Sequence, residues 1–227
     1  MNIAIIGDSW GVPVPNIHTN HTQQVLEKFG YDVVNFSNIG GANIPSIKKC
    51  FSHCTNNKID LIIWFHTDFL REVTFFNFNT NNREFIKENH KINLFEIIHS
   101  ISIKTYKEFE KLRNFSGAKV IIIGGQAKIL DNFFEYSNAD FLIKDWRSEI
   151  LQIESVDNSM LYFNNLVHSN NNTMSNKEKF IIMKHFVKIF RELKKSPLFP
   201  DNHHTGDEPH IELANKIHKF IQEDIKK

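Results

Sequence analysis

The sequence predicts an α/β fold in which helices cover both faces of a mainly parallel, five-stranded sheet, giving a three-layer, doubly wound domain. Short apolar runs rich in Ile and Val alternate along the chain with segments of helical periodicity. Such runs are typical of strands buried on both faces, and their alternation with helices indicates parallel pairing through right-handed crossovers. The chain has 227 residues, 41% of them hydrophobic, which is the size of one domain spanning residues 1–227.

The first half of the chain alternates strand and helix. Residues 2–7 form an apolar run that ends in glycine, and residues 31–36 form a second apolar run. Between them, residues 17–29 carry apolar side chains at helical spacing and are followed by a glycine that stops the helix. A Gly-Gly turn then leads to a predicted helix over residues 44–54, whose proline lies at an early position where it is tolerated.

The second half continues the same alternation. Strands are expected at three further apolar segments, residues 60–66, 118–124 and 139–143. Helices are expected at residues 94–115, 177–193 and 211–225. Two Asn-rich stretches show no periodicity and are expected to be irregular, either as binding loops or as insertions, at residues 75–93 and 155–175.

Composition narrows the classes of partner. The formal net charge is only +1, so there is no basic field for bulk attraction of nucleic acid. No segment reaches the ~18 apolar residues of a membrane span, and the first apolar run is too short for a signal-peptide core. We therefore expect a cytoplasmic protein without a membrane partner. The richness in Asn, Lys, Ile and Phe is typical of AT-rich genomes, including those of certain phages.

Neither cysteines nor histidines form a recognisable metal motif. Cys50 and Cys54 share one face of a predicted helix, and two thiols with one histidine between them are too few ligands for zinc. A histidine-rich segment offers ligand types, but at a spacing that matches no metal pattern, at His203, His204, Asp207 and His210. We expect two buried thiols, no metal and no cofactor.

A nucleophile and a base are placed at opposite ends of the chain. Ser9 follows the first strand, where a turn into a helix exposes the hydroxyl and directs backbone N–H groups at a reaction centre. Asp201 and His204 lie three residues apart, so the carboxylate is able to accept a hydrogen bond from Nδ1 and leave Nε2 for the serine. Together they predict a Ser-His-Asp triad; the alternative for Ser9 is an ordinary helix N-cap.

These two blocks resemble those of the SGNH, or GDSL-type, hydrolases. The first block is Gly7-Asp8-Ser9, and the last is Asp201-x-x-His204, followed by His210, Leu213-Ala214 and Ile217. The resemblance implies a flavodoxin-like SGNH hydrolase fold. It also implies that Ser9 is the nucleophile and that Asp201 and His204 complete the triad of an ester hydrolase.

The resemblance also implies an oxyanion hole, and here the sequence departs from the family pattern. Backbone N–H groups of Ser9 and of Gly41 or Gly40 are the expected donors, with the alignment favouring Gly41. The family has Gly-x-Asn-Asp after the third strand, and its Asn side chain is a further donor. In this chain Thr67 stands at the Asn position, so either its hydroxyl substitutes, His66 supplies the donor, or catalysis is weak.

Three further side chains are candidates for substrate contact. Trp10 either lines the substrate pocket or belongs to the core, and Arg71 either binds an anionic substrate group or forms a surface ion pair. His66 completes this set. The leading hypothesis is a serine esterase acting on a small-molecule or glycan ester, such as an O-acetyl group. The alternatives are a weakly catalytic carbohydrate-binding or interaction protein, and an acyltransferase with the same triad.

Overall fold

The computed structural model describes residues 1–67, 72, 94–125, 139–152, 196–201 and 204–225. Within this part of the chain, five strands form one fully parallel sheet in the order β2-β1-β3-β4-β5. Their bounds are Asn2–Gly7, Asp32–Asn35, Leu61–His66, Lys119–Gly124 and Phe141–Ile143 for β1 to β5. The parallel α/β architecture expected from the apolar runs is confirmed. The chain order reverses between β1 and β3, which is where sheets of this kind bind ligands.

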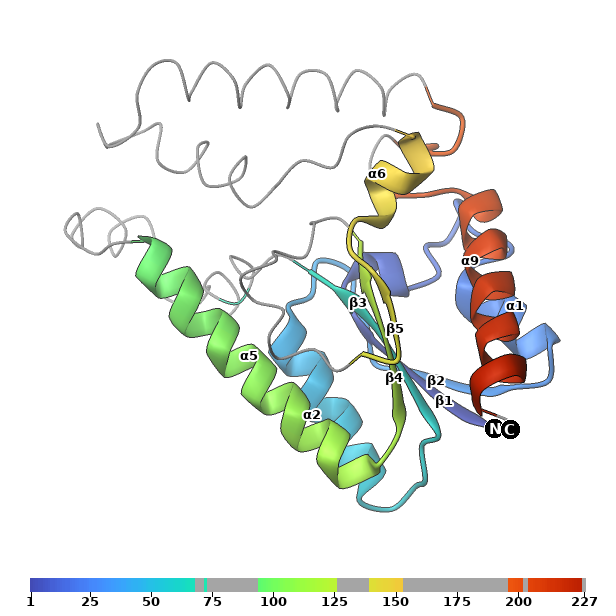
Figure 1. The fold of residues 1–227 in the computed structure, drawn as a ribbon. Coiled ribbons are helices and arrows are strands. Elements are labelled where there is room, and N and C mark those ends of the chain that lie inside the picture. The colour runs from blue at the N-terminus through green and yellow to red at the C-terminus, as the bar shows by residue number, and fades with distance from the viewer. Residues whose placement is uncertain (68–71, 73–93, 126–138, 153–195, 202–203, 226–227) are drawn as a thin grey trace, which may run out of the picture.

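Helices cover both faces of the sheet. On one face lie α1 (Thr22–Lys28) and α9 (Asp207–Phe220), and on the other lie α2 (Asn43–Cys54) and α5 (Leu94–Ser116) (Figure 1). Three short elements complete the described fold, namely η1 (Ser9–Gly11), α6 (Trp146–Leu151) and η3 (Ile221–Ile225). Both η1 and α6 follow strands, so they belong to the carboxyl edge of the sheet.

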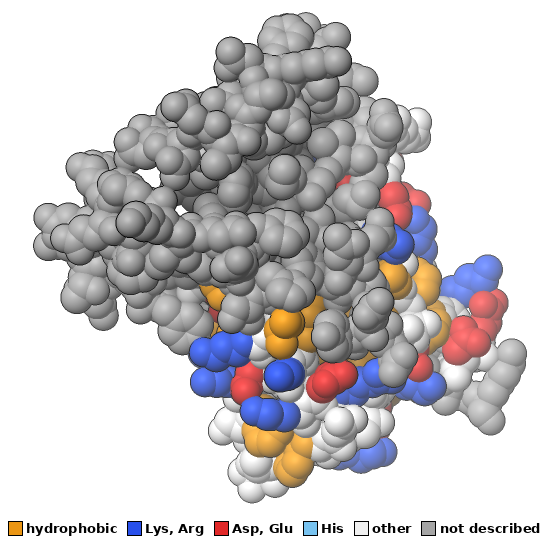
Figure 2. Space-filling model, turned by 60° about the vertical axis from the view of Figure 1, so that its left-hand side comes forward, with side chains coloured by type: hydrophobic (Ala, Val, Ile, Leu, Met, Phe, Trp, Pro, Cys, Tyr) orange, Lys and Arg blue, Asp and Glu red, His pale blue; other side chains and the backbone are white. Residues whose placement is uncertain are grey.

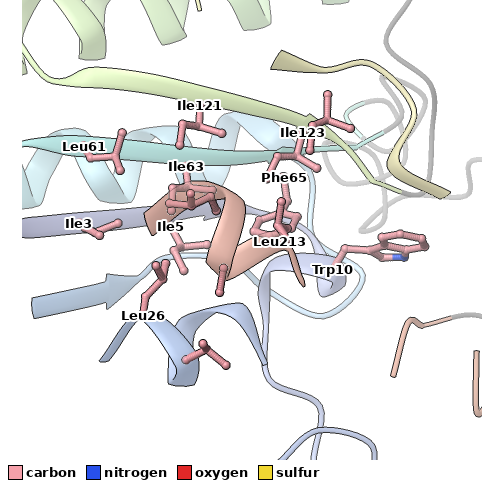
Figure 3. Packing of buried hydrophobic residues seen from close by; sticks show 14 of the residues in the cluster. Ile3, Ile5, Trp10, Leu26, Leu61, Ile63, Phe65, Ile121, Ile123 and Leu213 are labelled. Atoms are coloured by element: carbon pink, nitrogen blue, oxygen red, sulfur yellow. The ribbon is translucent and has the colours of Figure 1, made fainter. Parts of the chain in front are cut away.

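Alternate strand residues divide the core between the two faces. Ile3 and Ile5 of β1 pack under α1 and α9, whereas Ala4 and Ile6 pack under α2 and α5. The same alternation in β3 and β4 gives the row of buried Ile, Leu and Phe side chains in Figure 3, with Trp10 at its end. Burying a side chain of this size contributes about 1.5–3 kcal/mol, so the two rows account for the fixed register of the sheet.

Two helix starts differ from the sequence prediction. The helix expected from residue 17 begins at Thr22, because the ring of His21 caps it by accepting from the Gln23 N–H, while the Gln24 side chain accepts from the His21 N–H. The helix expected from residue 211 begins earlier, at Asp207. A proline in its first turn is tolerated because that N–H has no helical partner.

Several predictions fall outside the described residues, namely the helix over 177–193 and the irregular stretches over 75–93 and 155–175. On the described part of the face in Figure 2, lysine and acidic side chains stand next to each other rather than forming a field of one sign. An example on α5 is the ion pair of Lys111 with Glu108, at 2.7 Å. No described helix combines the length and the apolar character that crossing a bilayer demands.

Candidate functional site

Ser9 begins η1 directly after β1 and Asp8. The Asp8 carboxylate accepts a hydrogen bond from the Trp10 N–H, and the Asp8 carbonyl accepts from the Gly11 N–H, both at 3.0 Å. This tight turn folds the chain back onto the core, and Ser9 is only 4% exposed. The expectation of an exposed hydroxyl is therefore wrong, although the turn after the first strand is present.

Gly7 fixes the start of this turn against the neighbouring strand. Its φ is +133°, and a Cβ at this position would lie 2.0 Å from the carbonyl oxygen of Phe65 in β3. The Gly7 N–H donates to the Ser46 hydroxyl of α2 at 3.1 Å. Only glycine adopts this conformation and tolerates this contact. Gly7 therefore fixes the end of β1 relative to β3, just before Ser9.

Asp201 and His204 form the hydrogen bond expected from their spacing. The Asp201 Oδ2 lies 2.6 Å from His204 Nδ1, and Oδ1 accepts from the His204 N–H at 2.6 Å. A carboxylate at Nδ1 places the ring proton there and leaves the lone pair of a neutral imidazole on Nε2. The His204 side chain is 15% exposed, so the ring lies near the protein surface rather than in the core.

Aromatic side chains bring the two ends of the chain together. The rings of Trp10 and Trp146 meet edge to face at 5.6 Å, and Trp146 is 5.1 Å from the ring of His210. Phe199, just before the Asp201 turn, lies 6.1 Å from Trp10. Trp10 is 2% exposed, which favours the core interpretation over the pocket-lining one. The Trp10 ring, which follows Ser9 in η1, therefore packs against Phe199 and connects the Ser9 turn to the loop that carries Asp201.

Three buried histidines lie next to these aromatic side chains. The ring centroids of His21 and His210 are 4.0 Å apart, and His18 lies 5.1 Å from His21 and 4.7 Å from His210. Burial lowers the pKa of all three, that of His21 to about 3. They are therefore neutral at physiological pH. His204 lies near enough to His18 and His210 to lower their pKa further.

These histidines are hydrogen-bonded within the protein. His21 Nε2 lies 3.1 Å from the carbonyl oxygen of Trp10, next to Ser9, and both ring nitrogens of His18 and of His210 have protein partners. In the described ranges, no three His, Cys, Asp or Glu side chains converge in a way that would hold a metal ion. The free cysteines lie on α2; Cys50 is buried as expected, whereas Cys54 is only partly buried.

The end of β3 is held by a residue that sequence reasoning missed. The Asn43 side chain accepts from the Thr67 N–H and from Trp64 Nε1, and donates to the Thr67 carbonyl, each at 3.0 Å. Thr67 is fully buried, and its hydroxyl has no hydrogen-bond partner among the described residues. The contacts of Asn43 with its backbone therefore hold Thr67 in place, while the hydroxyl finds no acceptor in the part of the chain that the structure describes.

His66 packs on the α5 side of the sheet. It is 2% exposed, and its ring is 5.1 Å from that of Trp64 and stacks at 6.3 Å on that of Tyr106 in α5. Burial lowers its pKa to about 3. This position among aromatic rings favours a role in packing over the contact with substrate that the sequence suggested.

The Gly40-Gly41 turn has one N–H already engaged. Gly41 donates to the carbonyl of Asn38 at 2.9 Å, whereas Gly40 is exposed with φ +67°. The motif alignment favours Gly41 as the backbone donor to the oxyanion. The hydrogen bonds favour Gly40 instead, because its N–H has no acceptor among the described residues. Beyond the turn, Glu72 caps α2 by accepting from the N–H groups of Asn43 and Ile44, and burial raises the pKa of its carboxyl group.

Arg71 and His203, two candidates from the sequence, lie outside the described residues. No protein-family model matches the chain, and no curated protein is significantly similar to it.

Proposed function

We propose that the protein is a serine ester hydrolase in which Ser9, His204 and Asp201 act as a triad. The observation that carries the proposal is the hydrogen bond of 2.6 Å between Asp201 Oδ2 and His204 Nδ1. It gives the imidazole the tautomer that a general base needs. The loop that bears this pair packs, through Phe199, on the Trp10 ring next to Ser9.

The reaction follows from these roles. Ser9 Oγ attacks the ester carbonyl carbon while His204 Nε2 takes the hydroxyl proton, and the carbonyl electrons move to the oxygen. The oxyanion electrons then re-form the carbonyl, the ester C–O bond breaks, and His204 gives its proton to the leaving alkoxide, which leaves an acyl-serine. Water, deprotonated in turn by His204, attacks the acyl carbon; the bond to the serine oxygen then breaks, His204 returns the proton to that oxygen, and the acid is released. The backbone N–H groups of Ser9 and Gly40, with the Thr67 hydroxyl, are the proposed donors to the oxyanion.

The substrate proposed from the motif resemblance is a small-molecule or glycan ester such as an O-acetyl sugar. A non-catalytic binding protein is the second candidate, and the burial of Ser9 and of the Thr67 hydroxyl favours it. The two candidates differ in one chemical property. Only a hydrolase needs an activated serine.

Covalent labelling tests this property without knowledge of the substrate. A fluorophosphonate should label Ser9, as read by peptide mass, and hydrolysis of a chromogenic acetate should be abolished in Ser9→Ala. Asp201→Asn should lower the labelling rate by on the order of 10² to 10⁴, because the wrong tautomer is then favoured. A wild-type protein that is folded yet inert toward the probe would falsify the triad and leave the binding protein as the better account.

A further inference from the structure

Thr205, the residue that follows His204, is held on two sides by buried histidines. His18 Nε2 lies 2.6 Å from the Thr205 carbonyl oxygen, and His210 Nε2 lies 2.8 Å from the Thr205 hydroxyl. Thr205 is 1% exposed, so water does not replace these contacts. The backbone on the carboxyl side of His204 is thus fixed by two groups from elements far apart in the sequence.

The contacts of His18 determine which of its nitrogens bears the proton. The Val14 N–H donates to His18 Nδ1 at 2.8 Å, so Nδ1 is an acceptor. In a neutral ring the proton is then on Nε2, which donates to the Thr205 carbonyl. A neutral ring agrees with the burial that lowers the pKa of His18.

The same reasoning orients His210. The Thr22 hydroxyl donates to the His210 carbonyl at 3.3 Å and therefore accepts from His210 Nδ1–H at 2.8 Å. This leaves Nε2 as the acceptor for the Thr205 hydroxyl. Every polar group in this set thus has a matching partner, as a rigid buried network needs.

The network is anchored at both ends. The Asp207 carboxylate, in the first turn of α9, accepts from the N–H groups of Thr19 and Asn20 at 2.9 and 2.8 Å, directly after His18. His21, three residues on from His18, contacts the Trp10 carbonyl beside Ser9. The loop before α1 therefore touches both the serine turn and the histidine loop.

We propose that His18 and His210 are positioning residues that set the place of the His204 imidazole through Thr205. Asp201 fixes the ring from its Nδ1 side, and the clamp on Thr205 fixes the backbone that carries it. The role of His204 as a base rests on the proposed function, whereas its placement by the clamp does not. Two matched pairs of variants test the placement of His204 separately from its role as a base.

The first pair changes one nitrogen of His18. In His18→Asn the amide replaces the Nδ1 acceptor but has no donor near Thr205, whereas in His18→Gln an amide N–H reaches the place of Nε2. The rate of Ser9 labelling should fall about tenfold or more in His18→Asn, as expected for a displaced general base, and stay within about threefold of wild type in His18→Gln.

The second pair changes the other side of the clamp. Thr205→Val keeps the shape and removes the hydroxyl that donates to His210, while Thr205→Ser keeps the hydroxyl. The labelling rate should again fall about tenfold in the valine variant and recover in the serine variant. Because the substitutions lie on different elements, one pair decides the matter if a member of the other fails to fold.

The ring ¹⁵N signals of His204, recorded by NMR on the full chain, give a readout that needs no activity. They should shift in His18→Asn and Thr205→Val and return in His18→Gln and Thr205→Ser. Unchanged signals and rates in both folded loss variants would overturn the clamp. An inert wild-type Ser9 would reject the proposed hydrolase, and the ¹⁵N signals would still decide for or against the clamp.

Discussion

The two faces of the sheet both bury histidine, and they do so in different ways. Under α1 and α9, His18 and His210 hydrogen-bond to Thr205, and His21, three residues on from His18, hydrogen-bonds to the Trp10 carbonyl beside Ser9. Under α5, His66 stacks on aromatic rings. On the first face the hydrogen bonds of the histidines reach loops that are far apart in the sequence, and such directed bonds hold those loops in one geometry. We therefore expect the proposed site on the α1–α9 face.

The largest expected contrast is in the stability of matched leucine variants. His210→Leu leaves the buried Thr205 hydroxyl without its acceptor and takes the Nδ1 donor from Thr22, so the free energy of unfolding should fall by about 3 kcal/mol. His66→Leu keeps an apolar contact with Trp64, and it should lower the free energy of unfolding by less than His210→Leu does. Urea denaturation measures both, and equal losses would show that the two faces do not differ.

Lowering the pH should destabilise the protein through the buried histidines of both faces. The pKa of His21 and that of His66 are both lowered to about 3 in the folded protein, against about 6.5 when unfolded. Between these values only the unfolded chain takes up the proton. Stability is therefore fully present above about pH 6.5 and falls as the pH drops toward 3, by up to about 1.4 kcal/mol per pH unit for each ring.

The measurement is urea denaturation of wild type and His66→Gln from pH 7.5 to 5. The variant should lose the contribution of one ring, and its stability curve should be flatter by about 1.4 kcal/mol per pH unit at the acid end. The pH dependence that remains in the variant includes the contributions of the three histidines on the α1–α9 face, whose pKa values are also lowered by burial. Parallel curves for the two proteins would mean that His66 takes up its proton in the folded state.

The smallest expected effect on stability is that of Thr67→Val. The hydroxyl is buried and has no hydrogen-bond partner among the described residues, so its removal should not lower the free energy of unfolding. If the hydroxyl donates to the oxyanion, kcat should nevertheless fall by on the order of tenfold with little change in KM. A silent Thr67→Val in an active enzyme would restrict the oxyanion hole to backbone donors.

Local patterns predicted the strands and the Asp201–His204 bond. Runs such as Ile3 to Ile6 bury both faces of a strand, and a spacing of three residues already limits how far a carboxylate and a ring can separate. The start of α1 was misplaced because the cap is His21, a residue seldom found there. The spacing of His18 and His21 was visible in the sequence, but nothing in it indicated a partner at His210.

Long-range contacts of this kind are set by the packing of α9 on α1, which no local pattern records. The same applies to Asn43, whose amide spans two backbone groups of Thr67 across the α2–β3 boundary. An asparagine after a Gly-Gly turn is an ordinary helix-start signal. Its function as a bridge became visible only when the end of β3 was placed beside it.

The contact between Gly7 and Phe65 restricts how this protein is able to evolve or be redesigned. Any side chain at position 7 meets a main-chain oxygen, which no rotamer change in a neighbour relieves. The barrier is thus independent of which residues surround it. In a library randomised around Ser9, glycine must therefore be held constant at position 7 and also at position 41, where a Cβ would lie 2.8 Å from the Asn38 carbonyl oxygen.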